Sequence, residues 1–187
     1  MTREYVQSGT IEEGLRQDIL WLLITIYSYV TRGRFEGLNQ MSREQFAIDA
    51  MLLDSAGRDI VARLTALDDD TRDNRSFQTL FAAMKREGLN ARRSRELDGK
   101  VKAYRKIVNE LKISHRNRYI AHVNMDAVIT PRSLDDPIPF GKAASMAVDL
   151  LDVMAKETIG YVFKVASDHK IDLRKALSLP SGVRAVP

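Results

Sequence analysis

The sequence predicts an all-α protein. Proline and glycine are scarce before residue 131, and no stretch shows the sustained alternation of apolar and polar residues that is typical of a half-buried strand. Apolar residues instead recur every three or four positions, which places them on one face of a helix. A hydrophobic content of 44% and a charged content of 29% are typical of a globular chain.

Five helices follow from this spacing and from the residues that start and stop helices. The first ends before Gly33 and Gly37, and the second begins at a capping box formed by Ser42 and Gln45. The acidic loop from 67 to 75 lacks the ligand spacing of a calcium loop, so we expect it to be solvated. The expected helices span about 10–31, 42–64, 76–86, 91 through a stripe ending at His122, and 140–168.

One domain over residues 1–170 accounts for these helices, and we expect 171–187 to form a flexible C-terminal tail. His169 is then a cation at the end of the last helix. The chain has no cysteine, which excludes disulfides and thiolate metal sites. Its longest apolar stretch, Ile19 to Val30, is too short to span a bilayer. We therefore expect a cytoplasmic protein without membrane attachment.

Positive charge is concentrated in one segment. Lys85 to Arg118 contains twelve cations and four carboxylates, a net charge of +8, whereas the remainder of the chain carries −4. Such a segment suits a nucleic-acid partner. The competing explanation is that lysine and arginine simply solvate an exposed helix.

The basic segment leads into Ser-His-Arg-Asn-Arg-Tyr-Ile-Ala-His, residues 114–122. The inward stripe Val101, Tyr104, Val108 and Leu111 continues on the same line as His115, Arg118 and His122. Arginine can bind a phosphate through several donors, and histidine can transfer a proton near neutral pH. This combination favours RNA chemistry without a metal. A histidine on a helix stripe can also be a structural residue that hydrogen-bonds inside the protein.

Arg116, Asn117 and His122 resemble the signature of the HEPN superfamily (higher eukaryotes and prokaryotes nucleotide-binding). That signature is an arginine, a polar residue and a histidine, with four to six residues between the arginine and the histidine. Five residues separate Arg116 from His122 here. The run from Arg116 to His122, its long preceding helix, and Arg63-Leu64 before the acidic loop are similar to the abortive-infection U-type (AbiU-like) branch.

The resemblance implies an antiparallel helical bundle that forms a homodimer and brings two copies of the motif together. Many such proteins are metal-independent endoribonucleases of toxin–antitoxin, abortive-infection or phage-defence systems. Arg116 and His122 would be the catalytic pair, with Asn117 orienting them. We therefore expect RNA as the substrate, an antitoxin protein as a further partner, and neither metal nor cofactor. The expected RNA-binding residues are Arg118, His115, Lys112, Arg105 and Lys106.

The motif leaves the arginine partner of His122 open. On an unbroken helix Arg116 lies about 120° around the axis from His122, whereas Arg118, four residues before it, shares its face. Three functions also remain open: a HEPN-type ribonuclease, a non-catalytic module that binds RNA or nucleotides, and a helical interaction protein with an acidic partner.

Overall fold

The structure, a computed structural model, describes residues 6–71, 74–113, 140–166 and 168–179, without the side chains of Leu38 and Asn39. The all-α prediction is confirmed: helices make up most of the described chain, with one small two-stranded sheet. The elements in chain order are α1 (Ser8–Gly33), η1 (Glu36–Gln40), α2 (Arg43–Ala66), α3 (Phe77–Arg86), α4 (Ala91–Leu111), α5 (Phe140–Ala155), β1 (Val162–Lys164), β2 (Lys170–Asp172) and α6 (Leu173–Ala176).

The boundaries of α1, α2 and α3 and the start of α4 follow the predictions closely, while the predicted continuation of the fourth helix to His122 lies outside the described residues. Ser42 caps α2 through the expected box with Gln45, and Ser76 caps α3 through an equivalent box with Thr79. Asn90 caps α4 by accepting a hydrogen bond from the Arg93 amide. These side chains satisfy amides that the first helical turn leaves free, so the sequence determines where α2, α3 and α4 begin.

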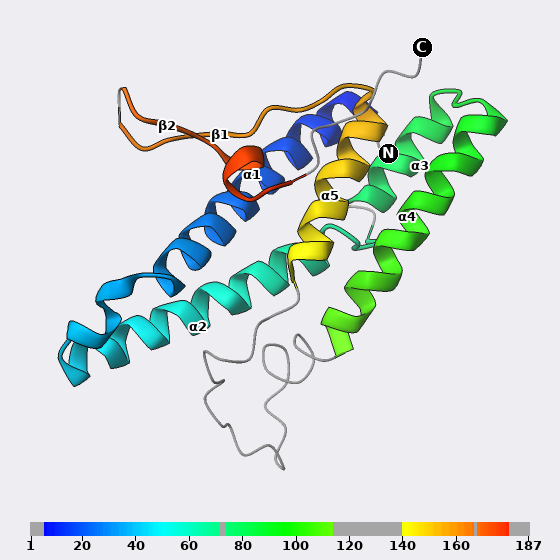
Figure 1. Cartoon of the computed structure of the whole chain (residues 1–187). Coiled ribbons are helices and arrows are strands. Elements are labelled where there is room, and N and C mark those ends of the chain that lie inside the picture. Colours follow the sequence, from blue (N-terminus) through cyan, green and yellow to red (C-terminus); the bar gives the residue numbers. More distant parts are fainter. Residues whose placement is uncertain (1–5, 72–73, 114–139, 167, 180–187) are drawn as a thin grey trace.

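Two helical hairpins and α5 enclose the core. In Figure 1, α1 and α2 form one hairpin, α3 and α4 form the other, and α5 lies between α1 and α4. The ring of Phe77 from α3 meets the ring of Tyr104 from α4 edge-on, with their centroids 5.0 Å apart. Leu15, Leu64 and Leu151 are fully buried in the same core. Because both hairpins contribute to this core, the C-terminal half of α4 is held against α2 and α5.

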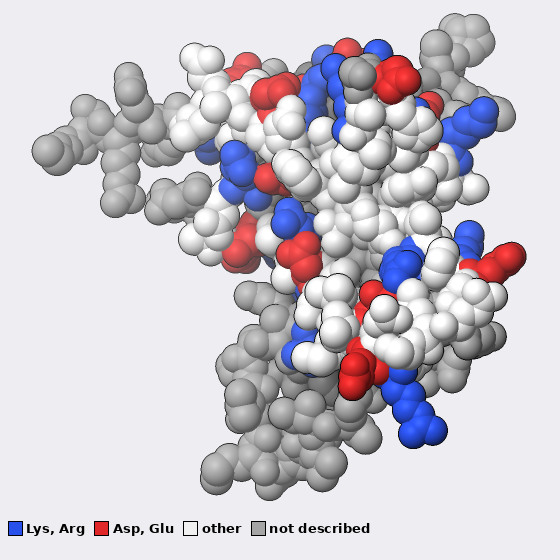
Figure 2. Space-filling view, turned by 90° about the vertical axis from the view of Figure 1, so that its left-hand side faces the viewer, with Lys and Arg blue, Asp and Glu red and all other residues white. Residues whose placement is uncertain are grey.

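The tip of the α1–α2 hairpin extends beyond this core. In the N-terminal half of α2, Ile48, Met51 and Leu52 are 58%, 71% and 62% exposed, and Phe46 is also exposed. Figure 2 faces this side of the molecule, where lysine, arginine and carboxylate side chains are interspersed among uncharged residues. These four apolar side chains therefore form an exposed surface.

The prediction that the last helix runs to Asp168 was wrong, because α5 ends at Ala155. Lys156 adopts a left-handed φ of 61°, and the Glu157 amide donates to the Asp152 carbonyl. Together these features form a Schellman-type helix end, in which a lysine occupies the position that usually holds glycine. Ile159, Val162 and Val165 continue the apolar spacing beyond Ala155, so the spacing alone did not reveal where α5 ends.

A β-hairpin and α6 take the place of that helix. β1 and β2 pair antiparallel, with Phe163 opposite Ile171. His169 lies in their connection, where its carbonyl accepts a hydrogen bond from the Val165 amide, so its predicted place at a helix end was wrong.

Part of the expected tail belongs to the fold. Leu173 is fully buried, and Arg174 donates to both carboxylate oxygens of Asp152 at 2.6 Å. The Arg174 Nε also donates to the Ile159 carbonyl, at 2.6 Å. Residues 171–179 therefore complete the bundle, while 180–187 lie outside the described residues.

Candidate functional site

The motif lies outside the described residues. These end at Ile113 and resume at Phe140, so the structure does not place His115, Arg116, Asn117, Arg118 or His122. What it does describe is the end of α4 that leads into the motif. The candidate site is therefore built from α4 and from the loop that α4 contacts.

The inward stripe of α4 is as predicted. Val101, Tyr104, Val108 and Leu111 are buried, and the Tyr104 hydroxyl donates to the Leu64 carbonyl at 2.8 Å. Burial, and secondarily the charge of Asp68, raises the pKa of Tyr104 well above its ordinary value. Tyr104 therefore stays protonated and remains a hydrogen-bond donor to the end of α2.

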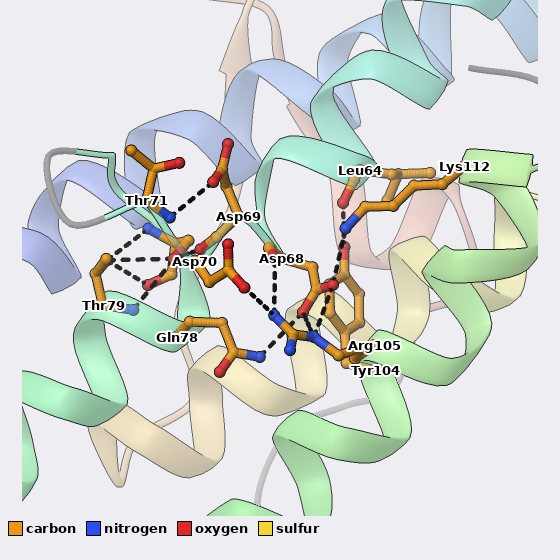
Figure 3. Close-up of polar contacts among 11 residues, drawn as sticks. Leu64, Asp68, Asp69, Asp70, Thr71, Gln78, Thr79, Tyr104, Arg105 and Lys112 are labelled. Carbon is orange, nitrogen blue, oxygen red and sulfur yellow. Dashed lines mark hydrogen bonds and ion pairs between the residues drawn. The ribbon is translucent and has the colours of Figure 1, made fainter. Parts of the chain in front are cut away.

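Asp68 joins the loop after α2 to Arg105 of α4 and to Lys112, which directly follows α4 (Figure 3). Its side chain is fully buried. The Arg105 Nε donates to Oδ1 at 3.0 Å, and the Lys112 Nζ donates to Oδ2 at 3.0 Å. Gln78 of α3 adds a bond to Oδ1, also at 3.0 Å. One carboxylate thus ties together α3, the loop and the last two turns of α4.

This arrangement corrects our expectation that the acidic loop is solvated. Asp70 is 79% exposed and contacts Arg105 only at 3.5 Å, but Asp68 is buried. Asp69 accepts hydrogen bonds from the Thr71 amide and the Asn74 side chain. The Thr71 hydrogen bonds hold the pKa of Asp69 below its usual value. Each of the three consecutive acids therefore has a different environment.

A pocket of about 460 Å³ opens beside this ion-pair cluster. It is lined by the end of α2, the three acids, Arg105, Asn109 and Lys112. In this pocket, Arg105 and Lys112 are already bonded to Asp68. An anion that enters the pocket therefore has to compete with the Asp68 carboxylate, which already binds both cations.

The expected RNA-binding residues of α4 therefore lie on different sides of the helix. Arg105 and Lys112 are seven residues apart, face the loop and bind Asp68. Lys106 lies about 100° around the helix from Arg105 and is exposed, with no ion-pair partner in the described chain. The sequence did not reveal this division. The only signal for it was the spacing of Arg105 and Lys112 beside the buried positions Tyr104 and Leu111.

Metal ligation has no support in the part of the chain that the structure describes. No group of three or more histidine or acidic side chains is placed there to hold a metal ion. Both oxygens of the Asp68 carboxylate are engaged by cations.

Comparison with known protein families shows which family this chain belongs to. The model of the HEPN family described as AbiU2 matches residues 9–174. The chain belongs to this HEPN family. The match covers every described helix except the first residue of α1 and the end of α6, so HEPN membership applies to the whole bundle and not to the motif alone. No curated protein matched the chain, and no solved structure matched it.

The HEPN match also spans the segment 114–122, where the sequence carries Arg116, Asn117 and His122. None of the described helices of this HEPN protein is sufficiently long and apolar to cross a membrane.

Proposed function

We propose that this HEPN protein is a metal-independent endoribonuclease that acts as a toxin or as an effector of abortive infection. The observation that carries the proposal is the Arg116-Asn117 pair with His122 in a chain whose residues 9–174 match a HEPN family. Family membership supports a role related to abortive infection. The residue types of the motif supply the chemistry.

His122 acts as the general base of the proposed reaction. It takes the proton from a ribose 2′-hydroxyl, and the 2′-oxygen then attacks the adjacent phosphorus. The bond from phosphorus to the 5′-oxygen breaks, and a protonated histidine of a second copy, or water, donates a proton to the leaving oxygen. The products are a 2′,3′-cyclic phosphate and a 5′-hydroxyl.

Arg116 stabilises the negative charge that builds on the phosphoryl oxygens, and Asn117 orients the pair. A homodimer supplies the second copy of the motif, and an antitoxin protein would restrain the activity in the cell. Because every charge is handled by protein side chains, this reaction proceeds without a metal ion. It therefore continues in the presence of a chelator.

Cleavage of labelled RNA in EDTA tests the proposal. We expect the wild-type protein to leave cyclic-phosphate ends, and His122→Ala to lose about two to four decades of rate. His169→Ala is the matched control, because His169 is exposed in the connection between β1 and β2. Cleavage that needs a divalent metal, or that survives in His122→Ala, contradicts the proposal.

Separate arginine variants identify the partner of His122. Arg116→Ala and Arg118→Ala remove the same group two residues apart, so each is the control for the other. We expect the larger loss of cleavage from Arg116→Ala. A loss confined to Arg118→Ala would transfer the phosphate-stabilising role to Arg118. Binding of RNA without any cleavage by the wild-type protein would instead indicate a non-catalytic RNA-binding module.

A further inference from the structure

The cations of α4 divide into two sets according to their contacts. Arg93 donates to the Val153 carbonyl of α5, Lys100 lies 3.7 Å from Asp149, and Arg105 and Lys112 bind Asp68. These four side chains attach α4 to the rest of the bundle. A second set of cations is exposed and makes none of these contacts: Arg92, Arg95, Lys102 and Lys106.

The second set forms one stripe along the outer face of α4. At 100° per residue the four positions fall within about 80° of arc, and Arg92 and Lys106 are about 21 Å apart along the axis. We call these four residues the outer stripe. α4 lies at the edge of the bundle in Figure 1, and the helices that it contacts, α2, α3 and α5, lie on its other side.

Small residues occupy the middle of the outer stripe. Gly99 and Ala103 are both exposed there, and a Cβ added to Gly99 would meet nothing within 4 Å. No large apolar side chain lies on this face between Arg92 and Lys106. The surface between the cations is therefore low and open, so a chain of phosphates can approach the helix closely.

Carboxylates neutralise only part of the outer stripe. Asp98 binds Lys102 at 2.6 Å, while Glu96 is engaged by Arg93 at 2.8 Å. Glu110 follows Lys106 by one helical turn on the same face, so it offsets part of the charge at that end of the stripe. Arg92, Arg95 and Lys106 have no carboxylate partner in the described chain. The stripe thus keeps a net positive charge along its length.

We propose that the outer stripe binds the sugar–phosphate backbone of single-stranded RNA and guides it toward the segment that follows α4. The inference rests on the proposed ribonuclease function. Protein interfaces have an apolar centre that is rich in aromatic residues, which the stripe lacks. Nucleic-acid interfaces are polar and strongly positive, which the stripe matches. The RNA contact on α4 therefore belongs to the outer stripe, whereas Arg105 and Lys112 hold the helix in place.

Binding is tested with an RNA that cannot be cleaved. A single-stranded RNA methylated at every 2′-oxygen lacks the attacking hydroxyl, so affinity is measured apart from catalysis. The variant carries Arg92→Gln, Arg95→Gln, Lys102→Gln and Lys106→Gln. The control carries Arg34→Gln, Arg43→Gln, Lys164→Gln and Lys170→Gln, which remove the same four charges at exposed positions near the α1–α2 tip and in the β-hairpin.

Fluorescence anisotropy at several salt concentrations gives the affinity and its salt dependence. Each phosphate contact to a single strand contributes about 0.7 to the slope of log K against log salt, so loss of four contacts lowers the slope by about 3. We expect this loss, and at least about tenfold weaker binding, in the outer-stripe variant only. Circular dichroism and thermal unfolding show whether both variants remain folded.

Each result bears on the inference independently of catalysis. Equal weakening in the variant and the control would show that only net charge matters and would overturn it. Unchanged binding in the outer-stripe variant would also overturn it, as would binding of polyglutamate as tightly as RNA of equal charge, which would indicate an acidic protein partner. Full RNA binding by His122→Ala, together with intact cleavage in that mutant, would refute the ribonuclease mechanism while leaving the stripe's role in place.

Discussion

The surroundings of Asp68 determine its structural role. It is the first of three consecutive acids, yet only its side chain is enclosed and bonded to Arg105, Lys112 and Gln78. A buried carboxylate needs partners that compensate for the water it has lost, and two cations and an amide fulfil that requirement. Lys112 follows directly after α4, so Asp68 holds the helix at the point where the chain continues toward the motif.

Replacing Asp68 tests this role in stability. Asp68→Ala removes the carboxylate that binds Arg105 and Lys112, and fully buried pairs lose about 3–5 kcal/mol when one partner is removed. Arg105 and Lys112 are 37% and 23% exposed and can turn partly to water, so we expect a loss of about 2–3 kcal/mol in the free energy of unfolding. Urea unfolding measures it.

Asp70→Ala is the control for Asp68→Ala. It removes the same group two residues away, where the side chain is 79% exposed, and we expect a change below about 0.5 kcal/mol. Equal losses in the two variants would show that the acidic loop acts only through its total charge.

At the scale of elements, α2 changes character along its length. Its C-terminal half carries fully buried Ile60 and Leu64, whereas its N-terminal half exposes Met51 and Leu52. Spacing alone suggested one continuous helix through all these apolar residues, and the helix is indeed continuous. The apolar spacing did not show that the rest of the bundle leaves part of the N-terminal half of α2 uncovered.

Substitution of two adjacent leucines, Leu52 and Leu53, tests the difference between the exposed and the buried side of α2. Leu53 is 5% exposed and Leu52 is 62% exposed, so Leu53→Ala removes packed methyl groups while Leu52→Ala does not. We expect a loss of about 2–5 kcal/mol from Leu53→Ala and less than about 0.5 kcal/mol from Leu52→Ala. Thermal and urea unfolding compare the two. A large loss from Leu52→Ala would mean that another surface covers the tip in solution.

At the scale of the whole molecule, the C-terminal region closes the bundle. Leu173 fills a fully buried position, and Arg174 neutralises Asp152, which is inaccessible to solvent on α5. Burial still raises the pKa of Asp152, against the opposing effects of the Ile159 amide and Arg174. Without Arg174, this carboxylate would be left in the interior with one backbone partner.

Truncation tests whether this region is required. A chain that ends at 170 lacks Leu173 and Arg174, so we expect it to lose about 5 kcal/mol or more, comparable with the whole stability of a typical domain. A chain that ends at 179 retains these contacts and serves as the control. Differential scanning calorimetry compares their unfolding temperatures.

A single substitution covers the case in which the short chain gives no soluble protein. Leu173→Ala in the full chain should cost about 2–5 kcal/mol. Unfolding at an unchanged temperature for the chain ending at 170, or for Leu173→Ala, would show that the segment is dispensable.

Local patterns in the sequence determined much of this protein. The apolar spacing identified α1 to α5, although not the end of α5, and the side chains of Ser42 and Ser76 determined where α2 and α3 begin, because caps act within one helical turn. The motif from Arg116 to His122 indicated the HEPN family, which the match over residues 9–174 then showed. Each of these signals depends only on residues that are near one another in the chain.

Only the tertiary structure decided which acid of the loop is buried, which α4 cations it engages and where α5 stops. Asp68 and Lys112 are 44 residues apart, and Asp152 and Arg174 are 22 residues apart. Neither pair therefore produces a spacing pattern that can be recognised in the sequence. Burial and ion pairing depend on what the folded chain brings together. A pattern of neighbouring residues carries no information about that.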